Sequence, residues 1–256
     1  MDKHIITEVA DHVLRIQINR PEKKNALTVA MYAEMAAACE HAAVDSGVRV
    51  ILIHGHPQVF TSGNDLSDFM NDPPASEDSP VFRFLRALSS AAKPVVAAVS
   101  GAAIGIGTSL LLHCDLVYAG ENTRFQLPFV NLGLVPEAAS SLLLPASIGY
   151  QRAAELLLLG EAFSAAKARD YGIVTEVVDD DAVLDTAMAA AKKLAAKPPA
   201  ALRLAKGLMK KAMAAAVAQQ MREEGEHFAR QLRSPEAAEA FKAFFEKRAP
   251  DYSKFS

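Results

Sequence analysis

The sequence predicts an α/β fold in which crossover connections return the chain to a central sheet. Short apolar segments typical of strands recur as far as Val177, and each is followed within a few tens of residues by a segment with helical spacing. The length of 256 residues suits one large domain, or one domain with an appendage. A hydrophobic fraction of 51% with 22% charged residues is typical of a folded globular chain and excludes extensive disorder.

Alternation and continuous apolar segments identify the strands. Leu14, Ile16 and Ile18 alternate with polar residues, which predicts a strand with one solvated face. From Thr28 the period changes, because Met31, Met35 and Cys39 recur every four residues and so mark one face of a helix. Further strands are predicted by the apolar segments at residues 48–53, 95–99, 116–118 and 172–177.

The composition changes after residues 197–199, Lys-Pro-Pro, and no strand pattern follows. Apolar residues then recur at roughly helical spacing, at Met209, Met213, Val217 and Met221. We therefore predict a core over residues 1–195 and a helical oligomerisation region over residues 196–256. The acidic, proline-rich residues 72–80 are interpreted as a surface loop that borders the functional site.

Charge and cysteine usage exclude several classes of protein. The net charge of −3 provides no positive field for nucleic acid. Cys39 and Cys114 lie far apart in apolar segments, which favours buried, reduced thiols and a cytoplasmic location. No signal peptide is expected at residues 1–13. The uncharged residues 94–112 are interpreted as a strand, a glycine loop and a buried helix, so no membrane span is expected.

Two glycine turns follow predicted strands and could present main-chain N–H groups to a site. Residues 105–110, Gly-Ile-Gly-Thr-Ser-Leu, lack the third glycine of a dinucleotide fingerprint, and no Walker-type lysine follows. The glycines could serve packing alone. Alternatively, this turn and residues 61–66, Thr-Ser-Gly-Asn-Asp-Leu, form an oxyanion hole, because helix N-termini favour negative charge.

Five segments together resemble the crotonase (enoyl-CoA hydratase/isomerase) superfamily over almost the whole chain. They are NRPEKKNAL at residues 19–27, VFTSGNDLSDF at 59–69, KPVVAAVSGAAIGIG at 93–107, FVNLGLVPEAASS at 129–141 and FEKRAP at 245–250. The resemblance implies the ClpP/crotonase-like fold, a spiral of strand-strand-helix (ββα) turns followed by a helical trimerisation region. It also implies an acyl-CoA thioester substrate and assembly as a homotrimer or a dimer of trimers.

Matched position by position, the resemblance implies site residues. The oxyanion donors would be the backbone N–H groups of Asn64 and Ile106, although the family more often has glycine at the second position. Hydratases of the family carry two glutamates where this chain has Ser109 and Phe129, so ordinary hydration is not supported. The residues implied to bind substrate or coenzyme A are Lys23, Lys24, Ser62, Gly63, Asp65, Leu66, Gly105, Phe129, Leu134 and Lys247. Asp65 is also interpreted as a helix cap or a structural acceptor.

Glu137 is the one carboxylate in the matched segment at 129–141 and is the predicted catalytic residue. It corresponds to the single glutamate of the enoyl-CoA delta isomerases, and SGNDL with PEAASS is most similar to the peroxisomal type. Moving a double bond from carbon 3 to carbon 2 of a thioester needs one proton removed and one returned, which a single desolvated carboxyl group can do. Without the resemblance, Glu137 reads as an acid favoured at a helix opening.

The prediction is therefore isomerisation of 3-enoyl-CoA to trans-2-enoyl-CoA in fatty-acid β-oxidation. No metal or redox cofactor is implied, and coenzyme A enters only as part of the substrate. One alternative is hydration or other crotonase-type acyl-CoA chemistry. The alternative of another class is a non-catalytic acyl-CoA-binding protein.

Overall fold

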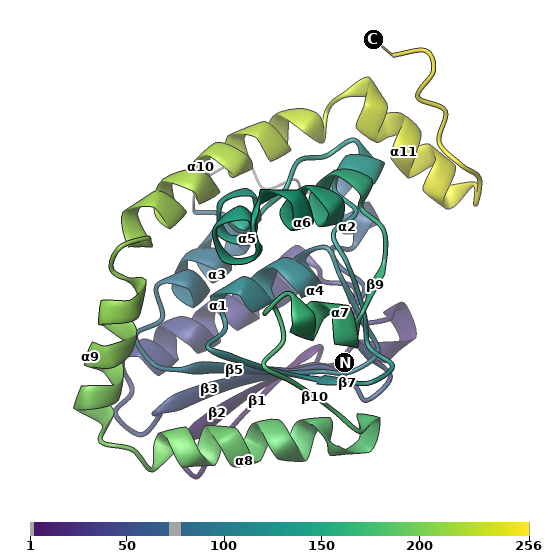
Figure 1. Ribbon diagram of the computed structural model, residues 1–256. Helices are drawn as coiled ribbons and strands as arrows, with labels where there is room; N and C mark the ends of the chain where they lie inside the picture. The colour runs from purple at the N-terminus through teal and green to yellow at the C-terminus, as the bar shows by residue number, and fades with distance from the viewer. Residues whose placement is uncertain (1–2, 72–77, 256) are drawn as a thin grey trace.

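The computed structural model describes residues 3–71 and 78–255, and these residues form two sheets with helices around them (Figure 1). The larger sheet has the strand order β1-β2-β3-β5-β7-β10, and the smaller sheet has the order β4-β6-β8-β9. The larger sheet contains β1 (Ile5–Ala10), β2 (Val13–Ile18), β3 (Val50–His54), β5 (Val95–Val99), β7 (Leu116–Gly120) and β10 (Glu176–Val178). The smaller sheet contains β4 (Val59–Thr61), β6 (Ala102–Ile104), β8 (Arg124–Gln126) and β9 (Phe163–Ser164).

Successive strands are added alternately to the two sheets, so the chain follows a spiral. Three successive strand pairs, β3/β4, β5/β6 and β7/β8, each give one strand to the larger sheet and the next strand to the smaller one. The strands contributed by these repeats pair in parallel within each sheet. Antiparallel pairs are found at the edges, between β1 and β2 and between β8 and β9.

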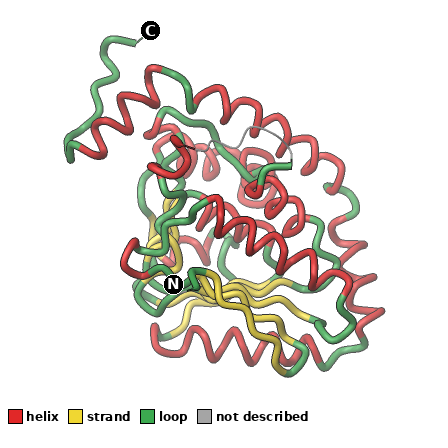
Figure 2. Tube along the Cα trace, turned by 180° about the vertical axis from the view of Figure 1, so that it is seen from behind, coloured by secondary structure: helices red, strands yellow, loops and turns green. Residues whose placement is uncertain are grey.

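Helices cover both faces of the larger sheet (Figure 2). One face carries α8 (Val183–Ala195), whose Ala187, Ala191 and Ala195 allow it to lie close to strand residues such as Leu52. The other face carries α1 (Val29–Val44), α3 (Pro80–Ser89) and α4 (Ile106–Ser109). Because both faces are buried, strands such as β3 and β5 are apolar throughout.

The remaining helices complete the layer around the site and the C-terminal region. They are α2 (Leu66–Asn71), α5 (Ser140–Ile148), α6 (Tyr150–Ala154), α7 (Ala165–Asp170), α9 (Pro199–Lys210), α10 (Ala214–Gln231) and α11 (Pro235–Phe245). Short 3-10 or π segments are η1 (Pro21–Lys23), η2 (Leu110–His113), η3 (Val130–Leu132), η4 (Glu155–Leu159) and η5 (Asp180–Ala182). Helices α9 to α11 run as an arm around the outside of the molecule (Figure 1).

Most of the predicted elements are present, with three corrections. Within residues 94–112 the expected strand is β5, but the glycine loop contains a second strand, β6, that was not predicted, and the expected helix is the short α4 followed by η2. Within the described residues no helix is long and apolar enough to cross a bilayer. The last strand of the larger sheet begins at Glu176 and not at Gly172, because Gly172 has a φ of 76° and ends the turn after α7. Met209 does not share a face with Met221, because residues 211–213 break the helix and leave Met209 75% exposed.

Two predictions on chain organisation are not decided by the structure. The oligomerisation role of residues 196–256, and the boundary before them, stay predictions. Of the predicted loop at 72–80, residues 72–77 lie outside the described residues, and Pro80 already opens α3.

A buried lysine attaches the helical arm to the core. Lys206 of α9 is 4% exposed, and its Nζ donates to Asp115 Oδ2 at 2.6 Å and to the Lys93 carbonyl at 2.8 Å. The same Asp115 oxygen accepts from the Val95 N–H at 2.7 Å, at the start of β5. The ion pair therefore connects α9 directly to the start of a central strand.

Replacing Lys206 by methionine should leave Asp115 without its cation in a largely buried position. We expect Lys206→Met to lower the free energy of unfolding by about 3 kcal/mol, because breaking one side of a buried pair strands the other charge. Urea denaturation followed by circular dichroism measures this effect. The matched control is Lys211→Met on the exposed break between α9 and α10, and equal stabilities for the two variants would contradict the prediction.

Candidate active site

Two glycine turns meet at one edge of the smaller sheet. The parallel strands β4 and β6 pair Val59 with Ala102 and Thr61 with Ala103, so their carboxyl ends lie together. The turn at 62–65 follows β4, and the turn at 105–106 follows β6. The approach is close, because a Cβ atom on Gly107 would stand 2.6 Å from Thr61 Cγ2.

The amide groups predicted as oxyanion donors are available in both turns. Neighbouring amides are used internally: Gly105 N–H donates to the Gln126 carbonyl at 2.9 Å, and Asp65 N–H donates to the Leu27 carbonyl at 2.8 Å. The N–H groups of Asn64 and Ile106 donate to no other residue in the described part of the chain. Two unused main-chain donors on adjacent strand ends can stabilise an anionic oxygen.

The backbone of the second turn requires glycine for conformational reasons. Gly105 has a φ of 57° and a ψ of −118°, which L side chains rarely adopt, and it directly precedes Ile106. Nothing lies within 4 Å of an added Cβ atom at Gly105, so space is not the constraint. Ile106 itself is fully buried, and its side chain does not affect its N–H as a donor.

The loop at residues 19–27 holds the first turn in place. Asn25 is fully buried, and its Nδ2 donates to the carbonyls of Ile18, Val59 and Phe60 at 3.0–3.1 Å. Arg20 forms an ion pair with Asp65 at 2.8 Å, and the Asp68 N–H donates to the same carboxyl group. Burial alone would raise the pKa of Asp65, but these two contacts help to lower it below its usual value.

Tyr32 of α1 connects the first turn to the acid. Its hydroxyl donates to Asn64 Oδ1 at 2.5 Å, and the ring is fully buried. Burial, and secondarily the charge of Glu137, raise the pKa of Tyr32 well above its usual range, so the hydroxyl stays a donor. The side chain of an oxyanion residue is thus fixed from the helix beneath the site.

Glu137 is a buried acid with a free oxygen. It lies between η3 and α5, is 8% exposed, and its Oε1 has no hydrogen-bond partner among the described residues. Burial, and secondarily the charge of Glu224, raise its pKa to about 8. Such a group exchanges protons near neutral pH and can act both as a base and as an acid.

An apolar pocket borders this acid. Its lining comes from α2, α3, α10 and the turn at residues 137–139 that carries the predicted acid, called the catalytic turn below. The lining residues are Phe69, Val81, Phe82, Leu85, Glu137, Ala138, Met221, Glu224, Gly225 and Phe228. Most of these side chains are apolar and they enclose a volume of about 20 Å³, so the pocket desolvates the Glu137 carboxyl and would have to widen to hold a hydrocarbon group.

The turn that carries Glu137 is strained and held from several sides. Ala138 and Ala139 have φ values of 60° and 55°, an unfavourable region for alanine. Ser140 Oγ donates to the Glu137 carbonyl at 2.6 Å, and His113 Nε2 lies 2.8 Å from the Ala138 carbonyl. Burial lowers the pKa of His113 to about 4, so the neutral ring donates through Nε2.

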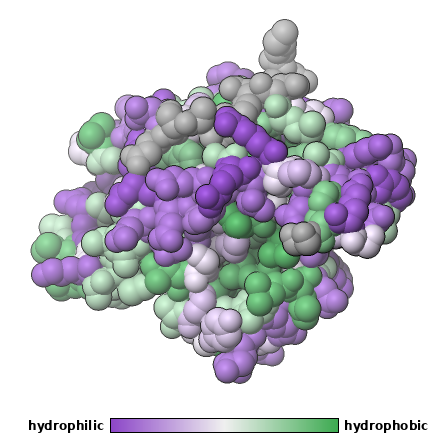
Figure 3. Space-filling view, turned by 90° about the horizontal axis from the view of Figure 1, so that it is seen from above, coloured by the Kyte–Doolittle hydropathy of each residue, from purple (hydrophilic) through white to green (hydrophobic). Residues whose placement is uncertain are grey.

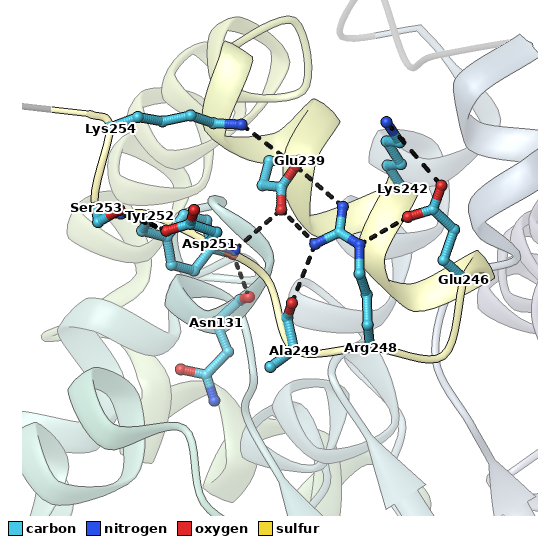
Figure 4. A network of polar contacts seen from close by, with 10 residues as sticks. All are labelled: Asn131, Glu239, Lys242, Glu246, Arg248, Ala249, Asp251, Tyr252, Ser253 and Lys254. Carbon is cyan, nitrogen blue, oxygen red and sulfur yellow. Dashed lines mark hydrogen bonds and ion pairs between the residues drawn. The ribbon is translucent and has the colours of Figure 1, made fainter.

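The C-terminal segment contacts Asn131 of η3, which precedes the turn that carries Glu137 (Figure 4). Tyr252 donates its hydroxyl to the Asn131 carbonyl at 2.7 Å, while Asn131 Nδ2 donates to the carbonyls of Leu159 and Gly160 at 3.2 Å. Arg248 pairs with Glu239 at 2.6 Å, and this hydrogen bond is the main reason that the pKa of Glu239 falls to about 2. Asn131 therefore joins η3 to the end of η4 and to the C-terminal segment, which is a structural role.

The predicted substrate residues fall into three groups. Ser62, Gly63, Leu66 and Gly105 lie in or beside the two turns, and Phe129 and Leu134 are buried on the segment that leads to Glu137. Lys23 and Lys24 are exposed. They lie beside the first turn, since the Ser62 N–H donates to the Lys24 carbonyl at 3.1 Å. Lys247 is exposed after α11, and its side chain contacts neither turn among the described residues. Their substrate roles stay predictions.

Sequence reasoning missed four residues that shape the site: Asn25, Tyr32, His113 and Glu224. The only usable signal was the position of Asn25 inside a matched segment. The others act across 25 to 85 residues of sequence, between elements whose packing no local pattern indicates.

A profile of the enoyl-CoA hydratase/isomerase family matches residues 8–254, nearly the full chain. This chain belongs to that family. The fold is correspondingly the crotonase fold: an enoyl-CoA hydratase/isomerase from Pseudoalteromonas atlantica T6c superposes with a TM-score of 0.94 at 43% identity, over 98% of this chain and 100% of that one.

Relatives with different activities are similar to this crotonase at similar levels. The 2,3-dehydroadipyl-CoA hydratase of Escherichia coli is 33% identical over 97% of this chain and 98% of its own. The 1,2-epoxyphenylacetyl-CoA isomerase of the same organism is 34% identical over 99% of both chains. Enoyl-CoA delta isomerase 2 of Rattus norvegicus is 35% identical over 82% of this chain and 55% of its own. Identity therefore does not single out the peroxisomal-type delta isomerases.

A substitution at Gly105 tests the second oxyanion turn. Gly105→Ala should lower kcat/KM for an acyl-CoA substrate by about 100-fold, because a strained φ moves the Ile106 N–H and one oxyanion donor is worth that much. The matched control is Gly149→Ala, which also has a positive φ and open space but lies after α5. Equal losses in the two variants would contradict the assignment.

Proposed function

We propose that this crotonase isomerises 3-enoyl-CoA to trans-2-enoyl-CoA, with Glu137 as the proton shuttle. The observation that carries the proposal is the unpartnered oxygen of a carboxyl group that is buried against an apolar pocket. Glu224, the other acid in the pocket, has both oxygens occupied by hydrogen bonds from residues 139 and 141. One free carboxyl is what a one-base proton transfer requires.

The steps use groups of this chain alone. The Glu137 carboxylate removes a proton from carbon 2 of the thioester, and the electron pair moves into the carbonyl to give an enolate. The N–H groups of Asn64 and Ile106 hold the enolate oxygen. Protonated Glu137 then returns the proton at carbon 4, and the double bond moves to carbon 2. The reaction is redox-neutral, so we expect no redox cofactor.

The residues at the two hydratase glutamate positions favour this proposal over hydration. Ser109 and Phe129 occupy the positions of the hydratase glutamates, and Ser109 Oγ is buried with no hydrogen-bond partner among the described residues. Neither side chain supplies the second carboxylate that activates water. Assembly as a homotrimer or a dimer of trimers and a role in fatty-acid β-oxidation remain part of the proposal by family resemblance, and a cytoplasmic location remains part of it from the cysteine usage.

The test is to mix the purified protein with trans-3-hexenoyl-CoA and to follow the ultraviolet absorbance of the conjugated thioester. We expect conjugation by the wild type and a loss of at least about 1000-fold in Glu137→Gln, which cannot accept the proton. The matched control is Glu226→Gln, an exposed acid on α10, which should retain the rate. Hydration of 2-enoyl-CoA without conjugation of the 3-enoyl substrate would refute the proposal.

The pH dependence follows from the raised pKa of Glu137. Only its ionised form removes the proton, so kcat/KM for the 3-enoyl substrate should rise with pH and level off above about 8. Initial rates at low substrate concentration between pH 5 and pH 9 measure this profile. An activity that is already maximal at pH 5 would mean that a group with an ordinary carboxyl pKa is the base.

A further inference from the structure

Glu224 is a buried acid of the helical arm that bonds to the backbone of the catalytic turn. It lies on α10, is 5% exposed, and its Oε2 accepts from the Ala139 N–H at 2.6 Å. Its Oε1 accepts from the Ser141 N–H at 3.0 Å and from Ser141 Oγ at 2.5 Å. Ser141 Oγ also accepts from Gln220 Nε2 at 3.1 Å, one turn earlier on α10.

These bonds replace a local helix cap. Ala139 stands at the N-cap of α5, has a left-handed backbone and offers no side-chain acceptor. The first N–H groups of a helix need an acceptor, and a negative charge is favoured there. Glu224 meets both needs from a segment 85 residues away in sequence, and it thereby holds the strained residues that follow Glu137.

Other contacts keep α10 against the same region. Gln231 Nε2 donates to the Gly133 carbonyl at 3.3 Å, just before the turn. A Cβ atom on Gly225 would lie 2.6 Å from the Phe82 ring, so α10 approaches α3 closely beside Glu224. Viewed from the side of α10, the surface carries a broad band of hydrophilic residues (Figure 3), whereas Glu224 points inward.

The charged and titratable groups around Glu137 and Glu224 come from four elements. Tyr32 of α1 and Glu224 of α10 face Glu137, while α2 and α3 contribute apolar side chains. His113 of η2 contacts the Ala138 carbonyl, with Lys206 and Lys210 of α9 behind it. Glu223 is the charge nearest to Glu224 on its own helix. Among the described residues, no cation forms an ion pair with Glu137 or Glu224.

We propose that Glu224 is a positioning residue: it fixes the turn that carries Glu137 and supplies the negative charge against which Glu137 exchanges its proton. The inference rests on the proposed function, in which Glu137 is the shuttle. The C-terminal arm thus takes part in setting up the site and is more than a cover for the core.

The direction in which the charge of Glu224 shifts the pKa of Glu137 is defined. Burial raises the pKa of Glu224, and the three hydrogen bonds from residues 139 and 141 oppose this shift by favouring the ionised form. The charge of Glu224 in turn adds to burial in raising the pKa of Glu137. Glutamine at position 224 is uncharged, so ionisation of Glu137 should become easier and its titration midpoint should fall.

The experiment is an infrared titration of the protonated carboxyl band of the full-length protein. The band that is missing in Glu137→Gln identifies the catalytic acid. We expect its midpoint to fall by about one pH unit in Glu224→Gln, and to stay unchanged in Glu224→Asp, which keeps the charge. The control Glu226→Gln, an exposed acid on the same helix, should also leave the midpoint unchanged. A purely structural role would not move the midpoint.

An unchanged midpoint in folded Glu224→Gln would overturn the proposal. If that variant does not fold, Ser141→Ala keeps the charge of Glu224 and removes the hydroxyl that partly neutralises it. The Glu137 midpoint should then rise, and a midpoint that falls or stays unchanged there overturns the proposal. The titration needs no turnover. A shifted midpoint in a protein that fails to conjugate 3-enoyl-CoA would therefore refute the isomerase proposal while supporting the inference on Glu224.

Discussion

The site depends on the burial of one carboxyl group without a full set of partners. An acid in apolar surroundings strongly disfavours its charged form, and the pKa of Glu137 rises to about 8 for this reason. The surroundings must also hold the acid in place, since it makes so few bonds of its own. Its backbone supplies that restraint: Ser140 and His113 bond to the carbonyls of residues 137 and 138, and Glu224 bonds to the amides that follow.

The two glycine turns, the predicted oxyanion hole, offer backbone groups alone. Parallel pairing of β4 and β6 brings two strand ends together, and the unused amides of Asn64 and Ile106 follow directly. Because the donors are backbone N–H groups, the unusual isoleucine at position 106 leaves the hydrogen-bonding chemistry intact. It changes only the space beside the donor.

The C-terminal region, from α9 onward, contacts the core at three places. Lys206 attaches α9 to the start of β5, Glu224 reaches the catalytic turn, and Tyr252 reaches Asn131. Each contact joins residues about 80 or more positions apart. Residues from α9 onward therefore contact a candidate site whose predicted oxyanion donors and proton shuttle lie within the first 137 residues.

The sequence by itself determined the α/β class, the apolar strands at 48–53 and 95–99, the two glycine turns and the candidate acid. These follow from local rules: hydrophobic period, glycine where φ is positive, and family motifs. It placed the last strand four residues early, because Gly172 has a positive φ and Ile173 and Val174, although apolar and buried, lie in the connection after α7, so pairing with β7 begins only at Glu176. Only the tertiary structure decided that Tyr32 bonds to Asn64 and that Glu224 bonds to Ala139. Those contacts depend on how distant helices pack, which no local pattern encodes.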